Sequence, residues 1–434
     1  MKPAPRNLTA WLGHMEALNP ASIDLGLARV YEVAERMGVL APAPVSVIVA
    51  GTNGKGSTCV CLEQILLAGG RRTGCTLSPH LESFRERVRI DGVEADNATL
   101  CAALDAVEAA RGDLPLTYFE YSCVATLFCF QAAAVDVAIL EVGLGGRLDA
   151  FNIVDADVAV VTSIGLDHMA YLGDSREAIG AEKAGVFRTG QRIALGAGMP
   201  DSVLTAAARA TQAPLLWGEG VRLLAGHGGY APGGWQVEVD GRRFPGLPAS
   251  VLPAENCALA TAAACAVDAV TGEDRVDARC VRQGWSEAWL PGRLEAFAAD
   301  GRQWLVDVAH NPLGAAFLNA EIPRRFPGCR LVAVFGNLHD KDSGAVCQAL
   351  DGLVRHWVLV DTPGPRGLSA EALSGRCDGV ERSVAGDLDA GLALARSLAE
   401  PSDVILAFGS FAVAQAARSR LSHYSMGQQD TPGE

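Results

Sequence analysis

The chain has 434 residues, of which 49% are hydrophobic and 20% are charged, a composition typical of globular proteins with two or three domains. Its formal net charge of -14 and its pI near 5.1 argue against nonspecific binding to DNA, RNA or an anionic membrane, which requires clustered Lys and Arg. A single nucleotide pocket is compatible with this charge, because a few local cations are enough for it.

The sequence predicts a soluble protein of the cytoplasm. Residues 1–7 are polar and rich in proline, with no recognisable targeting signal. The most apolar run, residues 121–135, carries no charge but is shorter than the roughly 20 residues that a membrane helix needs. Twelve cysteines are scattered through the chain, and the closest pair, Cys59 and Cys61, lacks the spacing of a metal site. We therefore expect buried, reduced thiols.

Apolar, β-branched segments alternate with helical stretches in the first half of the chain. We expect strands at residues 45–50, 136–141, 157–164 and 192–196. This alternation is typical of a parallel sheet covered by helices on both faces, in which ligands bind at the carboxyl ends of the strands. Because Gly51, Gly143 and Gly165 each follow one of these strands, the chemistry of the three loops can converge on one cleft.

The first strand runs into a glycine-rich loop, GTNGKGS at residues 51–57, which opens a helix. Its glycines let backbone N–H groups approach an anion, Lys55 adds a charge, and the helix presents its positive end. The loop is not a standard Walker A, which needs a glycine at Val49 and a hydroxyl at Gly56. An ordinary strand-to-helix turn is the simpler interpretation, but Lys and Ser beside three glycines exceed what a turn requires. The loop therefore predicts phosphate binding.

Four polar residues from different segments of the chain form a candidate metal site. Glu141 ends a buried strand, where an unpaired carboxylate is costly and a metal ion relieves the cost. A structural ion pair with Arg147 is the alternative. Together with Ser57, Ser78 and His168, Glu141 would give a divalent cation three oxygens and one nitrogen. Imidazole is an unusual ligand for magnesium, so His168 is the weaker member.

Lys183 lies near the end of a predicted helix that Asp174 and Glu177 are expected to cap. From the residues alone, the favoured interpretation is a solvated lysine stabilised by the helix dipole.

The composition of the chain changes after about residue 217. Residues 217–248 are rich in glycine and proline, which suggests a small β excursion before a helix at 256–269. A second series of alternating strands and helices then begins, which places a domain boundary near Leu290. We expect its strands at residues 304–308, 331–335, 357–361 and 404–408, with a helix at 388–398. Asp307 and His310 end the first of these strands and mark either a ligand edge or a satisfied turn.

The chain resembles the bifunctional dihydrofolate synthases/folylpolyglutamate synthases of bacteria, in the Mur ligase superfamily, from about Trp11 to Ala414. The strings that carry this resemblance are IDLGL at Ile23, AGTNGKGS at Ala50, SPHL at Ser78, LTYFEY at Leu116, ILEVGLGGRLDA at Ile139, NIVDADVAVVTSIGLDH at Asn152, EKAGVFR at Glu182, LPGRLE at Leu290, DVAHNP at Asp307 and LHDKD at Leu338. The resemblance implies an α/β fold, with a P-loop-type parallel-sheet ATPase domain over residues 1–290 and a smaller Rossmann-like domain over 291–434.

The implied reaction is the ATP-dependent ligation of L-glutamate to 7,8-dihydropteroate and to the γ-carboxyl of folylglutamates, through an acyl phosphate. Folylpolyglutamate synthase activity alone, or a non-catalytic nucleotide-binding protein, are the alternatives. The resemblance implies ATP and one or two Mg²⁺ ions, the second held by a carbamylated Lys183. The partners are then small molecules (dihydropteroate, reduced folates, L-glutamate and ATP), without nucleic acid or membrane, and a monomer is expected.

The resemblance also assigns residues to the site. The nucleotide positions are Thr52, Asn53, Gly54, Lys55, Gly56, Ser57, Asn256, Arg293 and Asp307. The catalytic positions are Lys55, Glu141, His168, Lys183 and His310, with Ser410 as a weaker glutamate candidate. The metal positions are Ser57, Ser78, Glu141, His168 and Lys183. The pterin positions are Asp24, Leu25, Gly26, Phe119, Glu120 and Asp149. One departure is Phe151, where the family usually has threonine, beside these pterin and metal positions.

Overall fold

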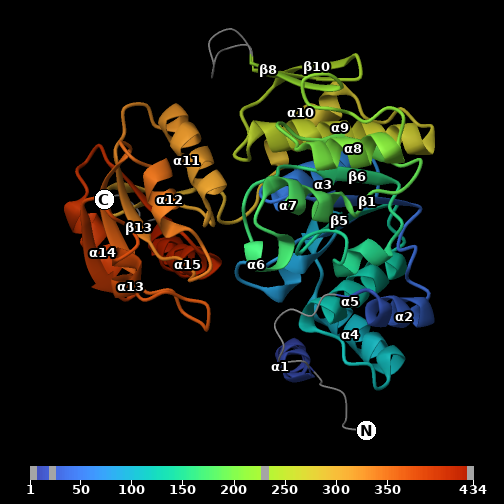
Figure 1. The fold of residues 1–434 in the computed structure, drawn as a ribbon, viewed down its shortest axis with the longest axis horizontal. Helices are drawn as coiled ribbons and strands as arrows, with labels where there is room; N and C mark the ends of the chain where they lie inside the picture. The colour runs from blue at the N-terminus through green and yellow to red at the C-terminus, as the bar shows by residue number, and fades with distance from the viewer. Residues whose placement is uncertain (1–6, 19–25, 226–233, 428–434) are drawn as a thin grey trace, which may run out of the picture. The chain divides into compact units, whose positions relative to one another are not determined.

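The structure, a computed structural model, describes residues 7–18, 26–225 and 234–427. The chain divides into two compact units, Met1–Trp289 and Leu290–Glu434 (Figure 1). Each is an α/β unit built on a largely parallel sheet, which confirms the predicted fold class. Asp24 and Leu25, two of the predicted pterin residues, lie outside the described residues.

A seven-stranded sheet forms the centre of the first unit, in the order β4-β3-β2-β5-β1-β6-β7. Its strands are β1 (Val45–Ala50), β2 (Thr73–Thr76), β3 (Val88–Ile90), β4 (Val93–Glu94), β5 (Val137–Glu141), β6 (Val158–Val161) and β7 (Arg192–Leu195). The four strands predicted from the sequence are confirmed, and all run parallel. Strand β2 joins them in parallel, whereas β3 and β4 extend this edge in the antiparallel sense.

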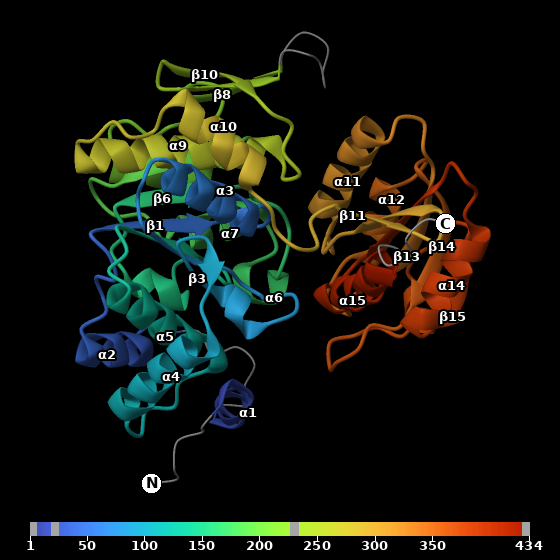
Figure 2. The same ribbon diagram turned by 180° about the vertical axis from the view of Figure 1, so that it is seen from behind.

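Helices cover both faces of this sheet, because its central strands are apolar on both sides. The helices are α1 (Leu8–Leu18), α2 (Ala28–Met37), α3 (Lys55–Ala68), α4 (Asn97–Arg111), α5 (Tyr118–Ala132), α6 (Met169–Leu172), α7 (Arg176–Ala184), α8 (Asp201–Ala210), α9 (Ala254–Thr271) and α10 (Ala278–Glu287). Figures 1 and 2 show α3, α9 and α10 on one face, and α2, α4 and α5 on the other. Most of the apolar run at residues 121–135 lies in α5, which is a largely buried helix. Among the described residues, no helix combines the length and apolarity needed to span a membrane.

A small antiparallel sheet extends the first unit. Its strands are β8 (Val221–Ala225), β9 (Trp235–Val239) and β10 (Arg242–Leu247). They confirm the predicted β excursion, and α9 confirms the helix expected after it. The cysteines carry free thiols, as predicted, and all are buried except the half-buried Cys101 and Cys329.

The second unit is a six-stranded sheet in the order β11-β12-β16-β13-β14-β15, with only β11 antiparallel. Its elements are β11 (Glu295–Ala299), β12 (Arg302–Val306), α11 (Pro312–Arg325), β13 (Leu331–Phe335), α12 (Ser343–Ala349), β14 (Val354–Val360), α13 (Ala370–Ser374), β15 (Arg382–Gly386), α14 (Leu388–Leu398), β16 (Val404–Phe408) and α15 (Phe411–Gly427). The four predicted strands and the helix at 388–398 are confirmed, while β11 and β15 were not predicted. The rings of Phe335, Trp357 and Phe408 pack against one another in its core, at T-shaped or tilted angles.

Candidate active site

The glycine-rich loop connects β1 to α3, and its backbone requires glycine at two positions. Gly51 has a φ of +149°, and a Cβ atom there would lie 1.9 Å from Oγ1 of Thr162. Gly54 has a φ of +87°, and a Cβ atom there would lie 2.5 Å from Oδ1 of Asn256. Both conformations are costly for other residues. The second contact also brings Asn256, on α9, against the loop, although the two are far apart in sequence.

The segment after β6 holds this loop in place. The Thr52 N–H donates to the carbonyl of Ser163 (2.8 Å), and the Thr52 hydroxyl accepts from the N–H of Gly165 (3.0 Å). The carbonyl of Asn53 accepts from the hydroxyl of Thr162 (2.6 Å). The structure thus brings together the ends of two neighbouring parallel strands, at the edge where such sheets bind ligands.

Two lysines converge on one carbonyl of the loop. Nζ of Lys55 donates to the carbonyls of Gly51 (3.2 Å) and Thr52 (3.4 Å), and Nζ of Lys183 donates to the same Gly51 carbonyl (2.9 Å). Lys183 is only 4% exposed, so the interpretation as a solvated lysine is wrong. Burial, and then the charge of Lys55, lower the pKa of Lys183 to about 7. The two amines thus meet at the glycine-rich loop, on the carbonyl of Gly51.

Helix α7 presents Lys183, and its cap differs from the expected one. The N-cap is Ser175, whose hydroxyl accepts from the N–H of Ala178 (3.2 Å). The predicted caps Asp174 and Glu177 are wrong: Glu177 lies inside the first turn and accepts from the N–H of Ser202.

Ser78 and Glu141 meet where β2 and β5 end. The Ser78 N–H donates to Oε2 of Glu141 (2.6 Å), while the Ser78 hydroxyl is buried without a hydrogen-bond partner. An orphaned buried hydroxyl is costly and fits a cation ligand. Arg147 pairs with Glu182 instead (2.9 Å), so the alternative of an ion pair between Arg147 and Glu141 is wrong.

The two remaining metal candidates come from neighbouring loops. Ser57 is buried in the first turn of α3, and His168, half-buried, precedes α6 with a left-handed φ of 50°. This conformation is unusual for a residue other than glycine. Within the described residues, no three His, Cys, Asp or Glu side chains cluster so as to hold a metal ion. A cation here would therefore need serine hydroxyls and oxygens of a bound phosphate.

Three of the predicted pterin residues that the structure describes have different roles. Phe119 offers a ring surface, whereas Glu120 and Asp149 hold the backbone near it. A Cβ atom at Gly143 would lie 2.4 Å from Cζ of Phe119, so the aromatic ring covers this glycine. Asp149 accepts from the N–H groups of Gly143 (2.9 Å), Leu144 (3.0 Å) and Phe151 (3.0 Å). Burial raises the pKa of Asp149 to about 6, and these hydrogen bonds oppose the shift. Asp149 thus braces the loop of residues 143–151, against which the ring of Phe119 packs.

Glu120 has a similar supporting role at the start of α5. It closes a capping box with Thr117 and forms an ion pair with Arg29 on α2 (2.8 Å). Its other carboxylate oxygen, Oε1, is buried without a hydrogen-bond partner. Gly26 lies two residues before α2.

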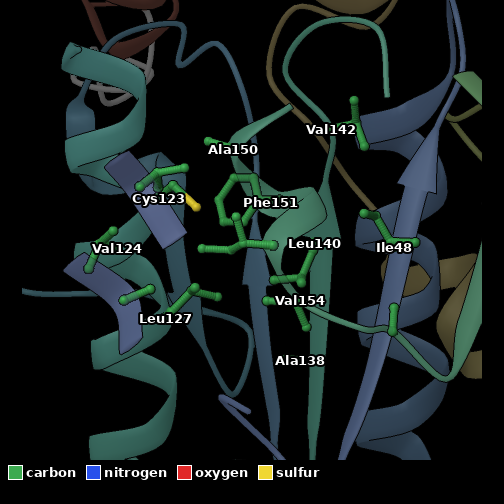
Figure 3. Packing of buried hydrophobic residues seen from close by; sticks show 14 of the residues in the cluster. Ile48, Cys123, Val124, Leu127, Ala138, Leu140, Val142, Ala150, Phe151 and Val154 are labelled. Carbon is green, nitrogen blue, oxygen red and sulfur yellow. The ribbon is translucent and has the colours of Figure 1, made fainter. Parts of the chain in front are cut away.

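Phe151, the departure from the family pattern, belongs to the core. Figure 3 shows its ring among side chains of α5 and β5, including Cys123 and Leu140. The ring is 2% exposed and packs edge-on against Phe119, with centroids 5.8 Å apart at 85°. Phe151 therefore fixes the orientation of Phe119.

We expect Phe151→Thr to lower the free energy of unfolding by about 2 to 3 kcal/mol, because it leaves a cavity and removes an aromatic pair. Chemical denaturation measures this change. The control is Tyr31→Thr, at an aromatic residue that is 43% exposed, where the change should stay within about 0.5 kcal/mol. Equal effects for the two variants would show that Phe151 is not a core residue.

In the second unit, three predicted residues lie near the carboxyl end of β12: Arg293 comes from the segment before β11, and Asp307 and His310 follow β12. The guanidinium of Arg293 lies over the ring of Phe411 (5.6 Å), and His310 approaches the same ring (6.4 Å between centroids). Buried Asp307 accepts from the N–H groups of Leu294 (2.8 Å) and Ala309 (2.7 Å). Burial raises the pKa of Asp307. Asp307 therefore ties together two segments, the one before β11 that carries Arg293 and the one after β12 that carries His310.

Two further polar residues flank these. Ser410 caps the first turn of α15 by accepting from the N–H of Val413 (3.2 Å). Fully buried Asn337 donates to the carbonyl of His310 (3.5 Å) and to the hydroxyl of Ser343 (3.3 Å). No motif marks Asn337 in the sequence, but its place two residues after the apolar strand β13 is a signal of the kind that marked Asp307 after β12.

A parallel sheet whose first strand enters a glycine-rich loop at a helix N-terminus defines the first unit as a nucleotide-binding α/β domain. Two family models match the chain: the Mur ligase middle domain over residues 49–195, and the Mur ligase glutamate ligase domain over residues 292–411. Both units thus have counterparts in the Mur ligases.

Relatives that match over nearly the whole chain identify one family within the Mur ligases. The chain is 42% identical to dihydrofolate synthase/folylpolyglutamate synthase of Escherichia coli over 407 residues, or 93% of each chain. The structure of Escherichia coli FolC in complex with DHPP and ADP matches with a TM-score of 0.90 at 39% identity, over 97% of this chain and 99% of that one. A folylpolyglutamate synthase/dihydrofolate synthase with Mn, AMPPNP and L-glutamate bound matches with a TM-score of 0.87 at 39% identity, over 97% and 100%. The chain belongs to the dihydrofolate synthase/folylpolyglutamate synthase family.

Proposed function

We propose that this protein is an ATP-dependent ligase that joins L-glutamate to 7,8-dihydropteroate and to the γ-carboxyl of folylglutamates. Its family membership over nearly the whole chain supports this reaction, as do the ADP, DHPP and L-glutamate bound by related structures. The observation in this chain that carries the proposal is the convergence of Lys55 and Lys183 on the Gly51 carbonyl. Lys55 would supply positive charge for a phosphoryl group at this loop, and Lys183 lies beside it.

Ligation requires activation, because a carboxylate resists attack by an amine. In the proposed first step, an oxygen of the acceptor carboxylate attacks the γ-phosphorus of ATP, which gives an acyl phosphate and ADP. In the second step the amine of L-glutamate attacks the acyl carbon, and the tetrahedral intermediate expels phosphate to leave the amide. Residues 52–57 would cradle the phosphates, and Lys55 would neutralise their charge.

We assign the divalent cation to Ser57, Ser78, Glu141 and His168. The buried, unpartnered hydroxyl of Ser78 supports this donor set, as does its backbone contact with Glu141. When bound, the cation would neutralise phosphate charge.

We also propose that Lys183 is carbamylated and holds a second cation. A carbamate forms when a neutral amine attacks carbon dioxide and releases a proton, and a pKa of about 7 keeps much of this amine neutral near pH 7. The product is an anion of the kind that hard cations prefer as a ligand.

The remaining assignments follow the division of the chain. Residues 1–290 would bind ATP and the pterin, with Phe119 as the ring surface and Glu120 and Asp149 as its supports, beside Asp24, Leu25 and Gly26. Residues 291–434 would supply Arg293 and Asp307 for the nucleotide, and His310 and Ser410 for L-glutamate. We also propose a cytoplasmic monomer with small-molecule partners alone.

A ligation assay tests this function. We expect ATP turnover to require both L-glutamate and a pterin carboxylate, with 7,8-dihydropteroate and tetrahydrofolate each accepted and a glutamyl product seen by mass spectrometry. Turnover with tetrahydrofolate alone favours folylpolyglutamate synthase activity only. ATP binding without turnover under every combination would support a non-catalytic nucleotide-binding protein and contradict the proposal.

A further inference from the structure

Arg87 lies beside the proposed metal site, and sequence analysis did not single it out. It ends the short 3-10 helix η1 (Phe84–Arg87), and its carbonyl accepts from the N–H of Leu77 (3.4 Å), the residue before Ser78. Its pKa is lowered by burial, an effect that the charges of Tyr118 and Glu141 partly offset. The guanidinium is thus a half-buried cation within electrostatic range of Glu141.

The surroundings of Arg87 fix its plane without neutralising its charge. Its guanidinium carbon lies 5.8 Å from the ring centroid of Phe84 and 5.7 Å from that of Tyr118. Its Nε donates to Nδ1 of His80 (2.8 Å), so this imidazole nitrogen carries no proton and His80 is neutral.

Among the described residues, Arg87 has no carboxylate partner. The adjacent Glu86 is occupied, because its oxygens accept from three backbone N–H groups, those of Leu81, Glu82 and Ser83, at 2.7 Å each. A cation that is partly desolvated and has no carboxylate partner is costly to maintain for the fold alone. The terminal nitrogens of Arg87 therefore suit an anionic ligand.

We propose that Arg87 binds the carboxylate of the pterin-bearing acceptor and orients it for attack on ATP, an inference that rests on the proposed function. A planar guanidinium matches a carboxylate through two parallel hydrogen bonds. The flanking rings favour a carboxylate attached to an aromatic group, and Tyr118 is adjacent to Phe119, the proposed pterin surface. Arg87 is a positioning residue in this scheme, because the bond-making atoms belong to the substrates.

The sharpest test compares two ligands that differ only at the carboxylate, which an uncharged amide of similar size replaces in the second. Equilibrium binding of 7,8-dihydropteroate and of its carboxamide is measured by calorimetry with ADP present, on the full-length protein. For Arg87→Met we expect the Kd of the acid to rise about 10- to 100-fold, the range for a hydrogen bond to a charged group. The Kd of the amide should stay within about twofold, and Arg87→Lys should recover part of the preference for the acid.

The matched control is Arg85→Met, two residues away, where the side chain is 40% exposed and donates to the carbonyl of Ala95. It should bind both ligands as the wild type does. Equal weakening of acid and amide by Arg87→Met would reveal a packing role and overturn the inference. An unchanged Kd for the acid, or a rise confined to the KM of L-glutamate or ATP, would also overturn it while leaving the proposed function intact. A wild-type protein that binds neither ligand would overturn both.

Discussion

Replacing Lys183 with methionine is expected to lower kcat for ligation about 10²- to 10³-fold, the usual cost of removing one preorganised electrostatic group. Methionine keeps the length and apolar stem of the side chain but can neither donate to the Gly51 carbonyl nor form a carbamate. The measurement is single-turnover ligation with saturating ATP. Short carboxylic acids should restore part of the activity to Lys183→Ala, because they supply the missing anion.

The low pKa of Lys183 gives this prediction a pH signature. The neutral amine that reacts with carbon dioxide gains population as pH rises through about 7, so activation by bicarbonate should increase over that range and vanish below it. A ¹³C carbamate resonance from labelled bicarbonate should be present in the wild type and absent in Lys183→Met. Full activity of Lys183→Met, or activity that ignores bicarbonate removal, would contradict the carbamate.

The low pKa of Lys183 also makes the stability of the fold depend on pH. A buried lysine whose pKa falls from its ordinary value of about 10.4 to about 7 binds fewer protons than the unfolded chain between these limits. Without bicarbonate, wild-type stability should therefore rise with pH from about 7 to about 10. Lys183→Met removes this dependence and should have a Tm at pH 7 that is equal to or above that of the wild type. The lysine is then retained for chemistry at the expense of stability.

The sequence predicts the central strands because they are apolar on both faces. Strands β1, β5, β13 and β16 have every residue buried and are rich in Val, Ile and Leu. The edge strands β11 and β15 lack this signal. In β11 and β15 exposed or half-buried residues dominate, so their composition resembles that of loops.

Strand β2 shows how packing can hide a central strand. Its sequence, TGCT, contains a glycine and is only four residues long. A Cβ atom at Gly74 would lie 2.5 Å from the ring of Phe130 on α5. The glycine is therefore needed for the close approach of a helix that follows much later in the chain, and no local pattern reports that approach.

In the site, too, features with a local sequence pattern were predicted, and features that depend on distant contacts were not. The sequence predicts the loop at 51–57, because three glycines, Lys55 and the start of a helix all fall within these seven residues. The burial of Lys183 is invisible locally, since its partner is a carbonyl on a distant loop. Arg87 was not predicted for the same reason. Phe84 is near it in sequence, but Tyr118, its second aromatic neighbour, belongs to the distant helix α5.

Replacing Glu141 with glutamine is expected to lower ligation about 10²- to 10³-fold, through the loss of charge at the cation site. The amide oxygen can still accept from the Ser78 N–H, so the local hydrogen bond survives and the fold should persist. The measurement is ligation rate against Mg²⁺ concentration, together with Mn²⁺ binding in the presence of AMPPNP by electron paramagnetic resonance. Both should require more metal than the wild type does.

A second buried carboxylate separates catalysis from folding. Glu63 is fully buried on α3 and pairs with Arg89 (2.9 Å). Glu63→Gln leaves the Arg89 charge poorly compensated, so it should lower Tm while ligation below the transition keeps its dependence on Mg²⁺. Glu141→Gln should do the reverse, with a Tm near that of the wild type. If both variants lost stability and neither changed its metal dependence, Glu141 would be a structural carboxylate. The unpartnered hydroxyl of Ser78 would then need an occupant other than a cation.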